Sequence, residues 1–331
     1  MLSRLSFRVL LSFLRGISLL TKEQIKYYHE EGYLLLPDIL EAETLLELRR
    51  VTEEVVSQAK ELTKHSDIFD LEPTHELNKP RIRRIKRPHL VHPFYKKLAS
   101  HRGILEALTP LLGEDIRMRP AGKINMKSAG FGSPVEWHQD WAFYPHTNEN
   151  ILAVGILLDD MNTDNGPLLV LPYSHKGPIY DHHDNGVFCG AIDVVREELN
   201  IGSARELWGR AGTITIHHAR LVHGSAANHS NEQRRILFYE YASADAWPLA
   251  GIESVEDLEE FNSRLVQGKP TLQPRLEEVP VRMPLPIDRS KDSIYEKQKA
   301  LSRRYFNAVS YTHLRAHETS LQLVCRLLLE K

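Results

Sequence analysis

The sequence contains few of the features that mark secreted, membrane-spanning or nucleic-acid-binding proteins. Its 331 residues include only two cysteines, Cys189 and Cys325, so no disulfide framework is expected and a reducing compartment is indicated. The apolar stretch at the N-terminus is too short to span a membrane and is interrupted by Arg15. The formal net charge of −2 gives no sign of a nucleic-acid partner. The apolar fraction of 42% and the charged fraction of 26% are typical of a soluble globular protein, so we expect a packed domain.

The two ends of the chain differ in character from the rest. Residues 1–20 contain three arginines, four serines and no acidic residue, which suits either a mitochondrial presequence or a start codon placed too early. From about Val309 the chain resembles a translated sequencing adapter, so we expect residues 309–331 to be a non-native tail. One domain is therefore predicted over residues 21–308. We expect a cytoplasmic protein, or a mitochondrial one only if residues 1–20 are a genuine presequence.

Hydrophobic periodicity predicts helices near the N-terminus and short strands after it. Thr21 and Gln24 form a capping box before a helix that ends near Gly32. Further helices are predicted over 41–60 and 101–112, and a strand over 33–36. After residue 116, β-rich runs alternate with turn residues, and strands are predicted over these ranges: 123–127, 152–158, 168–171, 212–216 and 236–241. The fold class is therefore mainly β with flanking helices, as a sandwich or barrel.

His138, Asp140 and His223 form the most informative pattern in the sequence. A His-x-Asp pair and a distant His are the ligand set of a facial iron site, in which three positions stay open for other ligands. In a strand, residues i and i+2 share one face, so His138 and Asp140 are expected to hold one metal while Gln139 points away. With 17 histidines and 44 acidic residues, such triplets also arise by chance. The β-prone residues around both motifs favour the metal site.

These motifs, together with others between Thr21 and Pro248, resemble those of the phytanoyl-CoA dioxygenase family. The matching segments are His138-Gln139-Asp140, Asn165-Gly166-Pro167-Leu168, Leu171-Pro172-Tyr173-Ser174-His175-Lys176-Gly177, His223-Gly224-Ser225 and Arg234. The resemblance implies a double-stranded β-helix, which is a cupin-like jelly roll. It also implies Fe(II) as cofactor, 2-oxoglutarate and O2 as cosubstrates, and hydroxylation of a small molecule with release of succinate and CO2. The 21–308 region would then be a single oxygenase domain.

The resemblance also assigns residues to the cosubstrate. The far carboxylate of 2-oxoglutarate requires a cation, and the planar fork of an arginine binds a carboxylate through two hydrogen bonds. Arg234 matches the family position, and Ser225 is expected to donate beside it. Arg235 is the alternative, but it should face the other side of the same strand.

The segment 123–127 alternates strictly between polar and apolar residues. Lys123, Asn125 and Lys127 share one face, which either meets solvent or lines the pocket. On the second interpretation, Asn125 and Lys127 help to bind the cosubstrate, and Lys123 meets an anionic group of the substrate. The substrate side is completed by three further candidates, which are more commonly core residues in proteins: Gln139, Trp141 and Phe143.

Several polar residues remain open to more than one interpretation. The basic run 81–87 is either a solvated face or an anion clamp that includes Arg83, Arg84 and Lys86. His182 and His183 follow an acidic residue in a loop and could reach the pocket mouth. His217 and His218 precede the distal ligand and are interpreted as packing residues or as supports for the ligands.

Two other classes of protein compete with the oxygenase. A metal-dependent hydrolase or isomerase on the same barrel would use the metal and a bound water, but it needs no dicarboxylate clamp such as Arg234 with Ser225. A non-catalytic binding protein would not need a complete ligand set. We expect a carboxylate-bearing small molecule as substrate, with no nucleic acid, membrane or obligatory protein partner.

Overall fold

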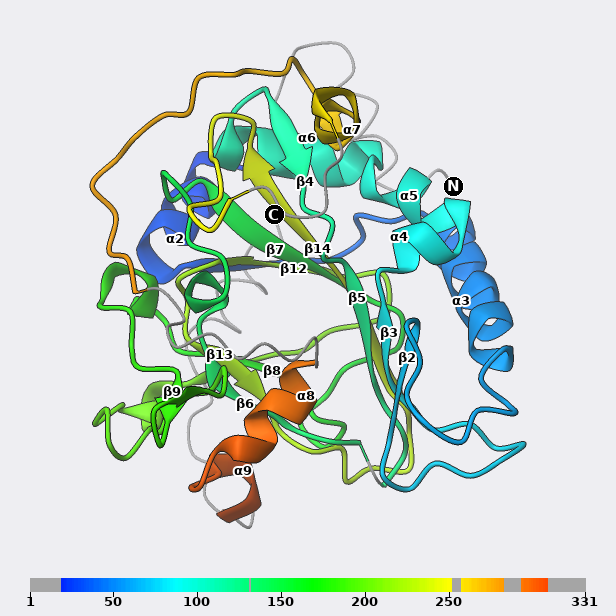
Figure 1. The fold of residues 1–331 in the computed structure, drawn as a ribbon. Helices are drawn as coiled ribbons and strands as arrows, with labels where there is room; N and C mark the ends of the chain where they lie inside the picture. The colour runs from blue at the N-terminus through cyan, green and yellow to red at the C-terminus, as the bar shows by residue number, and fades with distance from the viewer. Residues whose placement is uncertain (1–18, 131, 252–256, 283–292, 309–331) are drawn as a thin grey trace.

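The computed structural model describes residues 19–130, 132–251, 257–282 and 293–308 (Figure 1). The suspected non-native tail, and all of the N-terminal extension except Leu19 and Leu20, lie outside the described residues. The domain limits drawn from the sequence therefore stay predictions. Among the described residues, no helix is both long and apolar enough to cross a membrane.

The larger of two facing sheets has nine strands, and each recorded pairing is antiparallel. Its main path runs through β1 (Tyr33–Leu36), β12 (Ile214–His218), β7 (Ile151–Leu157), β14 (Arg234–Ser243), β5 (Lys123–Lys127), β3 (Ile82–Lys86) and β2 (Phe69–Leu71). Beside this path, β4 (Ile116–Met118) pairs with β14 and β15 (Leu265–Gln267).

The smaller sheet has four strands and lies across the barrel from the larger one (Figure 1). Its order is β11 (Arg205–Leu207), β8 (Leu168–Val170), β13 (His223–Ser225) and β6 (Val135–His138). A separate hairpin consists of β9 (His183–Asp184) and β10 (Val187–Phe188). Two antiparallel sheets that face each other in this way form a jelly roll, so the predicted fold class is confirmed.

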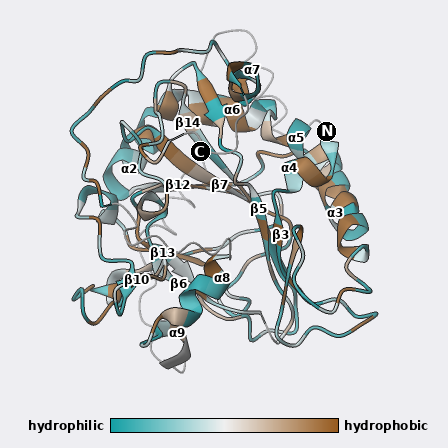
Figure 2. Ribbon diagram, in the orientation of Figure 1, coloured by the Kyte–Doolittle hydropathy of each residue, from teal (hydrophilic) through white to brown (hydrophobic). Residues whose placement is uncertain are grey.

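Helices cover the outer face of the larger sheet (Figure 1). They are α2 (Lys22–Glu31), α3 (Ala42–Ser57), α4 (Pro88–Val91), α5 (Pro93–Ala99) and α6 (Arg102–Leu112). Hydrophobic and hydrophilic residues alternate along α3 (Figure 2). The buried side of α3 belongs to one apolar core, which also includes Ile124, Val154 and Leu237 from the outer face of the larger sheet. This burial leaves the inner face of the same strands for the polar residues of the site.

The predicted start of α2 is confirmed in detail. Gln24 N–H donates to the Thr21 hydroxyl, and the Gln24 side chain accepts from Thr21 N–H. The helix ends at Gly32, whose φ of 88° is left-handed and whose N–H donates to Tyr28 O. A Cβ at Gly32 would lie 2.5 Å from His175 Nδ1, so only glycine fits.

The other predicted elements differ from the structure mainly at their ends. The strand over 123–127 matches β5, and the one over 33–36 matches β1. The helix predicted over 41–60 is shorter, and the strand predicted over 236–241 extends in both directions as β14. The remaining elements are short: η1 (Asp140–Ala142), η2 (Ser174–Lys176), η3 (Ile201–Ser203), α7 (Leu258–Asn262), α8 (Ile294–Lys297), η4 (Gln298–Ala300) and α9 (Tyr305–Ala308).

Candidate active site

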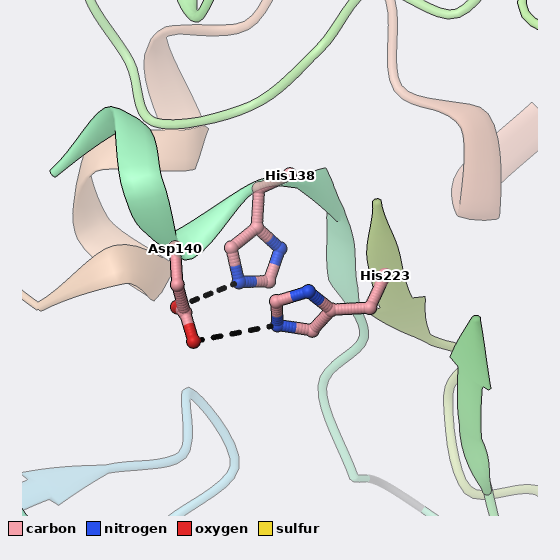
Figure 3. Close-up of side chains that lie close together, drawn as sticks. All are labelled: His138, Asp140 and His223. Atoms are coloured by element: carbon pink, nitrogen blue, oxygen red, sulfur yellow. Dashed lines mark ion pairs between the residues drawn. The ribbon is translucent and has the colours of Figure 1, made fainter. Parts of the chain in front are cut away.

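The structure brings His138, Asp140 and His223 together between the two sheets (Figure 3). His138 Nε2 lies 3.8 Å from Asp140 Oδ1, and His223 Nε2 lies 4.0 Å from Asp140 Oδ2. One ligand atom from each residue lies within 4.8 Å of the others, which is close enough for the three to converge on one ion. His138 and His223 face each other across paired strands β6 and β13, with ring centroids 4.1 Å apart.

The local backbone explains why His138 and Asp140 lie together. Strand β6 ends at His138, and Asp140 is the first residue of the 3₁₀ turn η1, but Gln139 between them keeps an extended backbone with φ of −117° and ψ of 128°. The residues on either side of an extended residue point to the same side of the chain. The strand argument therefore places these two side chains together, although the paired strand ends one residue before Gln139.

Backbone carbonyls fix the orientation of both ligand imidazoles. His138 Nδ1 donates to Glu136 O at 2.8 Å, and His223 Nδ1 donates to Leu221 O at 2.9 Å. A carbonyl oxygen can only accept, so the proton of each neutral ring is on Nδ1. The lone pair on each Nε2 is then free and directed at the common point. This arrangement is typical of histidines that bind metals.

The charge states of the three residues also suit a divalent cation. Burial lowers the pKa of His138 to about 4 and holds the pKa of His223 well below its ordinary value, so both rings are neutral near pH 7. Burial alone would raise the pKa of Asp140. The approach of His217 and the charge of Lys123 nevertheless hold it well below the ordinary value, so the carboxylate is ionised. Neutral imidazoles and an ionised carboxylate are the forms that bind iron.

The iron-free protein should lose stability as the pH falls from about 6.5 toward 4. Burial lowers the pKa of seven histidines: His89, His138, His146, His175, His182, His218 and His223. Below pH 6.5 the unfolded chain binds protons that the folded protein excludes, which favours unfolding. For His138 the full effect is about 3 kcal/mol.

Thermal unfolding of chelator-treated protein between pH 7.5 and 5 measures this effect. We expect the Tm to fall by several degrees. Burial raises the pKa of Glu72, Glu136 and Glu206, which acts in the opposite direction, but these groups are outnumbered. A Tm that is constant or rises toward pH 5 would contradict the buried, neutral state of these histidines.

A cavity of about 40 Å³ adjoins the three residues. Its lining combines polar residues with apolar side chains from both sheets: Lys123, Asn125, Val135, His138, Asp140, Ala153, Leu168, His217, His223, Gly224, Ser225, Arg234, Ile236, Phe238 and Ile294. Strand alternation from Arg234 also brings Ile236 and Phe238 to the same inner face. The site is therefore partly dry, which strengthens electrostatic interactions within it.

Arg234 and Ser225 lie together at the cavity wall. The Arg234 side chain is fully buried and donates from Nε to Gly166 O at 3.0 Å, while burial lowers its pKa to about 10, so it stays protonated at pH 7. Gly166 has a φ of 77°, and a Cβ there would lie 2.6 Å from Ala226 O. The tight turn at this glycine thus places the carbonyl that orients the guanidinium.

Lys127 is beside this pair but is not among the cavity-lining residues. Its Nζ donates to Ser225 Oγ at 2.8 Å and also to Ala226 O. The Lys127 amino group thus contacts Ser225, and its direct role in binding the cosubstrate stays a prediction. Asn125 does line the cavity, and its Oδ1 is buried with no hydrogen-bond partner among the described residues.

Lys123 and Glu240 form a charged pair on the inner face of the larger sheet. Lys123 Nζ lies 3.4 Å from Glu240 Oε1, and Glu240 also forms an ion pair with Arg119. Lys123 lines the cavity, as expected for a residue that contacts substrate. Glu240 keeps its ion pair with Arg119 if Lys123 turns toward an anion.

The structure gives structural roles to two of the other predicted substrate residues. Gln139 is buried, and its amide donates to Pro178 O and Arg220 O and accepts from Tyr180 N–H. Trp141 is also buried, and its indole N–H donates to a backbone carbonyl. Phe143 packs edge-on against His138. None of the three is among the residues found to line the cavity, so their substrate roles stay unsupported predictions.

The basic run 81–87 is neither a uniformly solvated face nor a simple clamp. Arg83 is buried and forms an ion pair with Glu296 of α8, and its guanidinium lies 4.6 Å from the Tyr295 ring centre. Lys86 forms an ion pair with Asp70 at 3.3 Å. The run therefore attaches α8 to the barrel, and α8 contributes Ile294 to the cavity wall.

Sequence reasoning did not identify every residue of the site. Ala153 and Ile294 have apolar side chains, which no sequence motif distinguishes from core residues. Ile294 is also far from the motifs in the sequence. His217 was identified, but without a specific role. His182 is buried and accepts a hydrogen bond from Gln139 N–H, so it holds the residue that joins β6 to η1, and it is not among the residues found to line the cavity.

The fold and the ligand set define the class of protein, which is a jelly-roll protein with a facial metal site of two histidines and one carboxylate. Comparison with known proteins then gives the family. The sequence model described as "Phytanoyl-CoA dioxygenase (PhyH)" matches residues 28–236. The chain belongs to the phytanoyl-CoA dioxygenase family, and it is a non-haem iron, 2-oxoglutarate-dependent dioxygenase.

Individual relatives agree with this assignment. The chain is 38% identical over 288 residues to a probable alpha-ketoglutarate-dependent hypophosphite dioxygenase of Stutzerimonas stutzeri, covering 86% of this chain and 99% of the relative. It is 29% identical over 238 residues to L-proline trans-4-hydroxylase of Streptomyces griseoviridis, covering 65% and 83%. The fold matches EctD from S. alaskensis with 2-oxoglutarate and 5-hydroxyectoine at a TM-score of 0.59 and 22% identity, covering 80% and 87%. The family membership and the two sequence relatives set aside the hydrolase and the non-catalytic alternatives.

Proposed function

We propose that the protein hydroxylates a small anionic substrate and that hypophosphite is the first compound to test. The observation that carries the choice of substrate is the 38% identity to the hypophosphite dioxygenase relative, which extends over 99% of that protein. Lys123 supports an anion because its ammonium group lines the cavity next to the metal-site residues. The substrate's anionic group would replace part of the interaction that Lys123 has with Glu240.

The chain's residues divide between the metal, the cosubstrate and the substrate. His138, Asp140 and His223 would hold Fe(II), which when bound supplies activation of O2 coupled to decarboxylation of 2-oxoglutarate. Arg234 and Ser225 would bind the far carboxylate of 2-oxoglutarate.

The overall reaction balances without a further reductant. One oxygen atom of O2 enters succinate while CO2 leaves 2-oxoglutarate, and the other converts a substrate P–H or C–H bond to P–OH or C–OH. With hypophosphite the product is phosphite. The protein's own contribution is to position the reactants and to exclude water from a cavity whose wall includes apolar side chains of both sheets.

Succinate formation that depends on an added substrate tests the proposal. Purified protein with Fe(II), 2-oxoglutarate and O2 should form succinate and phosphite in equal amounts when hypophosphite is added, with phosphite measured by phosphorus NMR. L-proline and other small carboxylates form the comparison panel. Succinate that rises with a carboxylate but not with hypophosphite would overturn the choice of substrate and keep the enzyme class.

Lys123→Met should raise the substrate KM about 10- to 150-fold and leave the KM for 2-oxoglutarate unchanged. The methionine keeps the unbranched shape and most of the length of the side chain but loses the charge that would meet the anion. Lys86→Met is the matched control because Lys86 is the register partner of Lys123 on β3, is not found in the cavity lining, and pairs with Asp70. A rise confined to the KM for 2-oxoglutarate would instead assign Lys123 to the cosubstrate.

A further inference from the structure

A third imidazole lies against the Asp140 carboxylate. His217 Nε2 is 3.5 Å from Asp140 Oδ2, and its ring centroid is 4.5 Å from that of His223. His217 belongs to β12, where it is paired with Tyr33 of β1 and Ala153 of β7 in the larger sheet. The imidazole is therefore held by the interior of a sheet and not by a loop.

His217 is buried without ordinary hydrogen bonds. Its side chain is 1% exposed, and among the described residues neither ring nitrogen has a hydrogen-bond partner beyond the approach to Asp140. A buried polar group left unpaired costs about 1–3 kcal/mol. Such exceptions in a folded protein call for an explanation, and a role in a catalytic or ion-binding site is one of those known.

The environment of His217 differs from that of the two ligand histidines. His138 and His223 each donate from Nδ1 to a carbonyl two residues earlier, which places a lone pair on Nε2. His217 lacks such a bond among the described residues, so its Nε2 can carry the proton. A carboxylate that binds a metal through one oxygen leaves the other oxygen as an acceptor, and a fixed donor there orients the ligand.

We propose that His217 is a positioning residue that donates from Nε2–H to Asp140 Oδ2. This bond would hold the carboxylate so that one oxygen is presented to iron and the second is kept away from it. Asp140 would then take a single coordination position, which leaves room for 2-oxoglutarate and O2. The proposal rests on the assignment of His138, Asp140 and His223 as iron ligands and is independent of the substrate.

The test replaces the donor while the ring volume is retained. His217→Phe should weaken Fe(II) affinity about 10- to 100-fold in anaerobic titrations. It should also weaken the visible charge-transfer band that forms when 2-oxoglutarate chelates bound iron. His217→Gln keeps an N–H donor and should restore most of both signals. A merely structural role would not predict this recovery.

The controls separate the possible causes. His218→Phe removes the adjacent histidine, which faces the other side of β12 with its ring 5.2 Å from His175, and should retain iron affinity. If His217→Phe does not fold, as judged by its Tm, His217→Leu and His217→Gln are compared instead, since they differ in the donor at similar size.

Two results would overturn the proposal. One is iron affinity and a charge-transfer band equal to wild type in His217→Phe while His138→Ala abolishes both. The other is equal loss in the Phe and Gln variants with unchanged Tm, which would indicate that ring shape and not the donor matters. If His138→Ala also retained iron, the ligand assignment itself would fail.

Discussion

Asp140→Ala and His138→Ala should each lose Fe(II) binding by more than about 100-fold and lose succinate formation. Replacing groups that support metal ligands commonly costs 10- to 100-fold, so losing a ligand should cost more. Asp140→Ala should weaken Fe(II) binding more than His138→Ala does, because Asp140 supplies the only carboxylate of the three-residue cluster. Without it, two neutral imidazoles remain to bind a divalent cation.

Anaerobic iron titration followed by metal analysis of the isolated protein measures this loss. His183→Ala is the control. Like His138, His183 lies two residues from an aspartate, but it belongs to the β9–β10 hairpin, forms an ion pair with Asp181 and is not part of the three-residue cluster. The control should bind iron as wild type does. Retention of one equivalent of iron by folded Asp140→Ala would sink the ligand assignment, and it would leave the family membership in place.

Arg234→Ala should raise the KM for 2-oxoglutarate by about 10- to 150-fold, with little change for the primary substrate. Hydrogen bonds to charged groups contribute about 1.5–3 kcal/mol, and each 1.4 kcal/mol is a factor of ten. Arg234→Lys should recover only part of the loss, because an ammonium group keeps the charge but not the planar fork.

Arg235→Ala is a control that the structure supplies directly. Arg235 is the next residue of β14 but faces away from the cavity and forms ion pairs with Asp159 and Glu53. Its removal should lower the Tm, because the partly buried Asp159 loses its partner, and it should not alter the KM for 2-oxoglutarate. If Arg235→Ala and Arg234→Ala changed this KM equally, Arg234 would not be the carboxylate partner.

The sequence predicted the metal cluster and the arginine because their chemistry requires particular residue types at fixed spacings. Strand alternation then separated Arg234 from Arg235 correctly, since β14 is a regular strand. The same rule placed His138 beside Asp140, because Gln139 keeps an extended backbone. The 3₁₀ turn that begins at Asp140 was not predicted, since the end of β6 depends on pairing with β13, which is far away in the sequence.

Residues with two plausible environments were the hardest to predict. Gln139 and Lys127 are polar residues next to the site, but backbone carbonyls and Ser225 use their hydrogen-bonding groups. Alternation shows which way a side chain points and does not show which partner it meets. The role of α8 was equally hidden, because its position depends on the ion pair between Arg83 and Glu296 across 213 residues of sequence.

The placement of Ile294 has an evolutionary consequence. The family model matches residues 28–236, and the proposed ligands and the arginine fall within that range, whereas Ile294 enters the cavity wall from α8 beyond it. Part of the wall is thus encoded apart from the catalytic motifs. Mutations in this outlying segment can reshape the cavity while the oxidative machinery stays unchanged, which gives a lineage a route to new substrates without passing through an inactive ancestor.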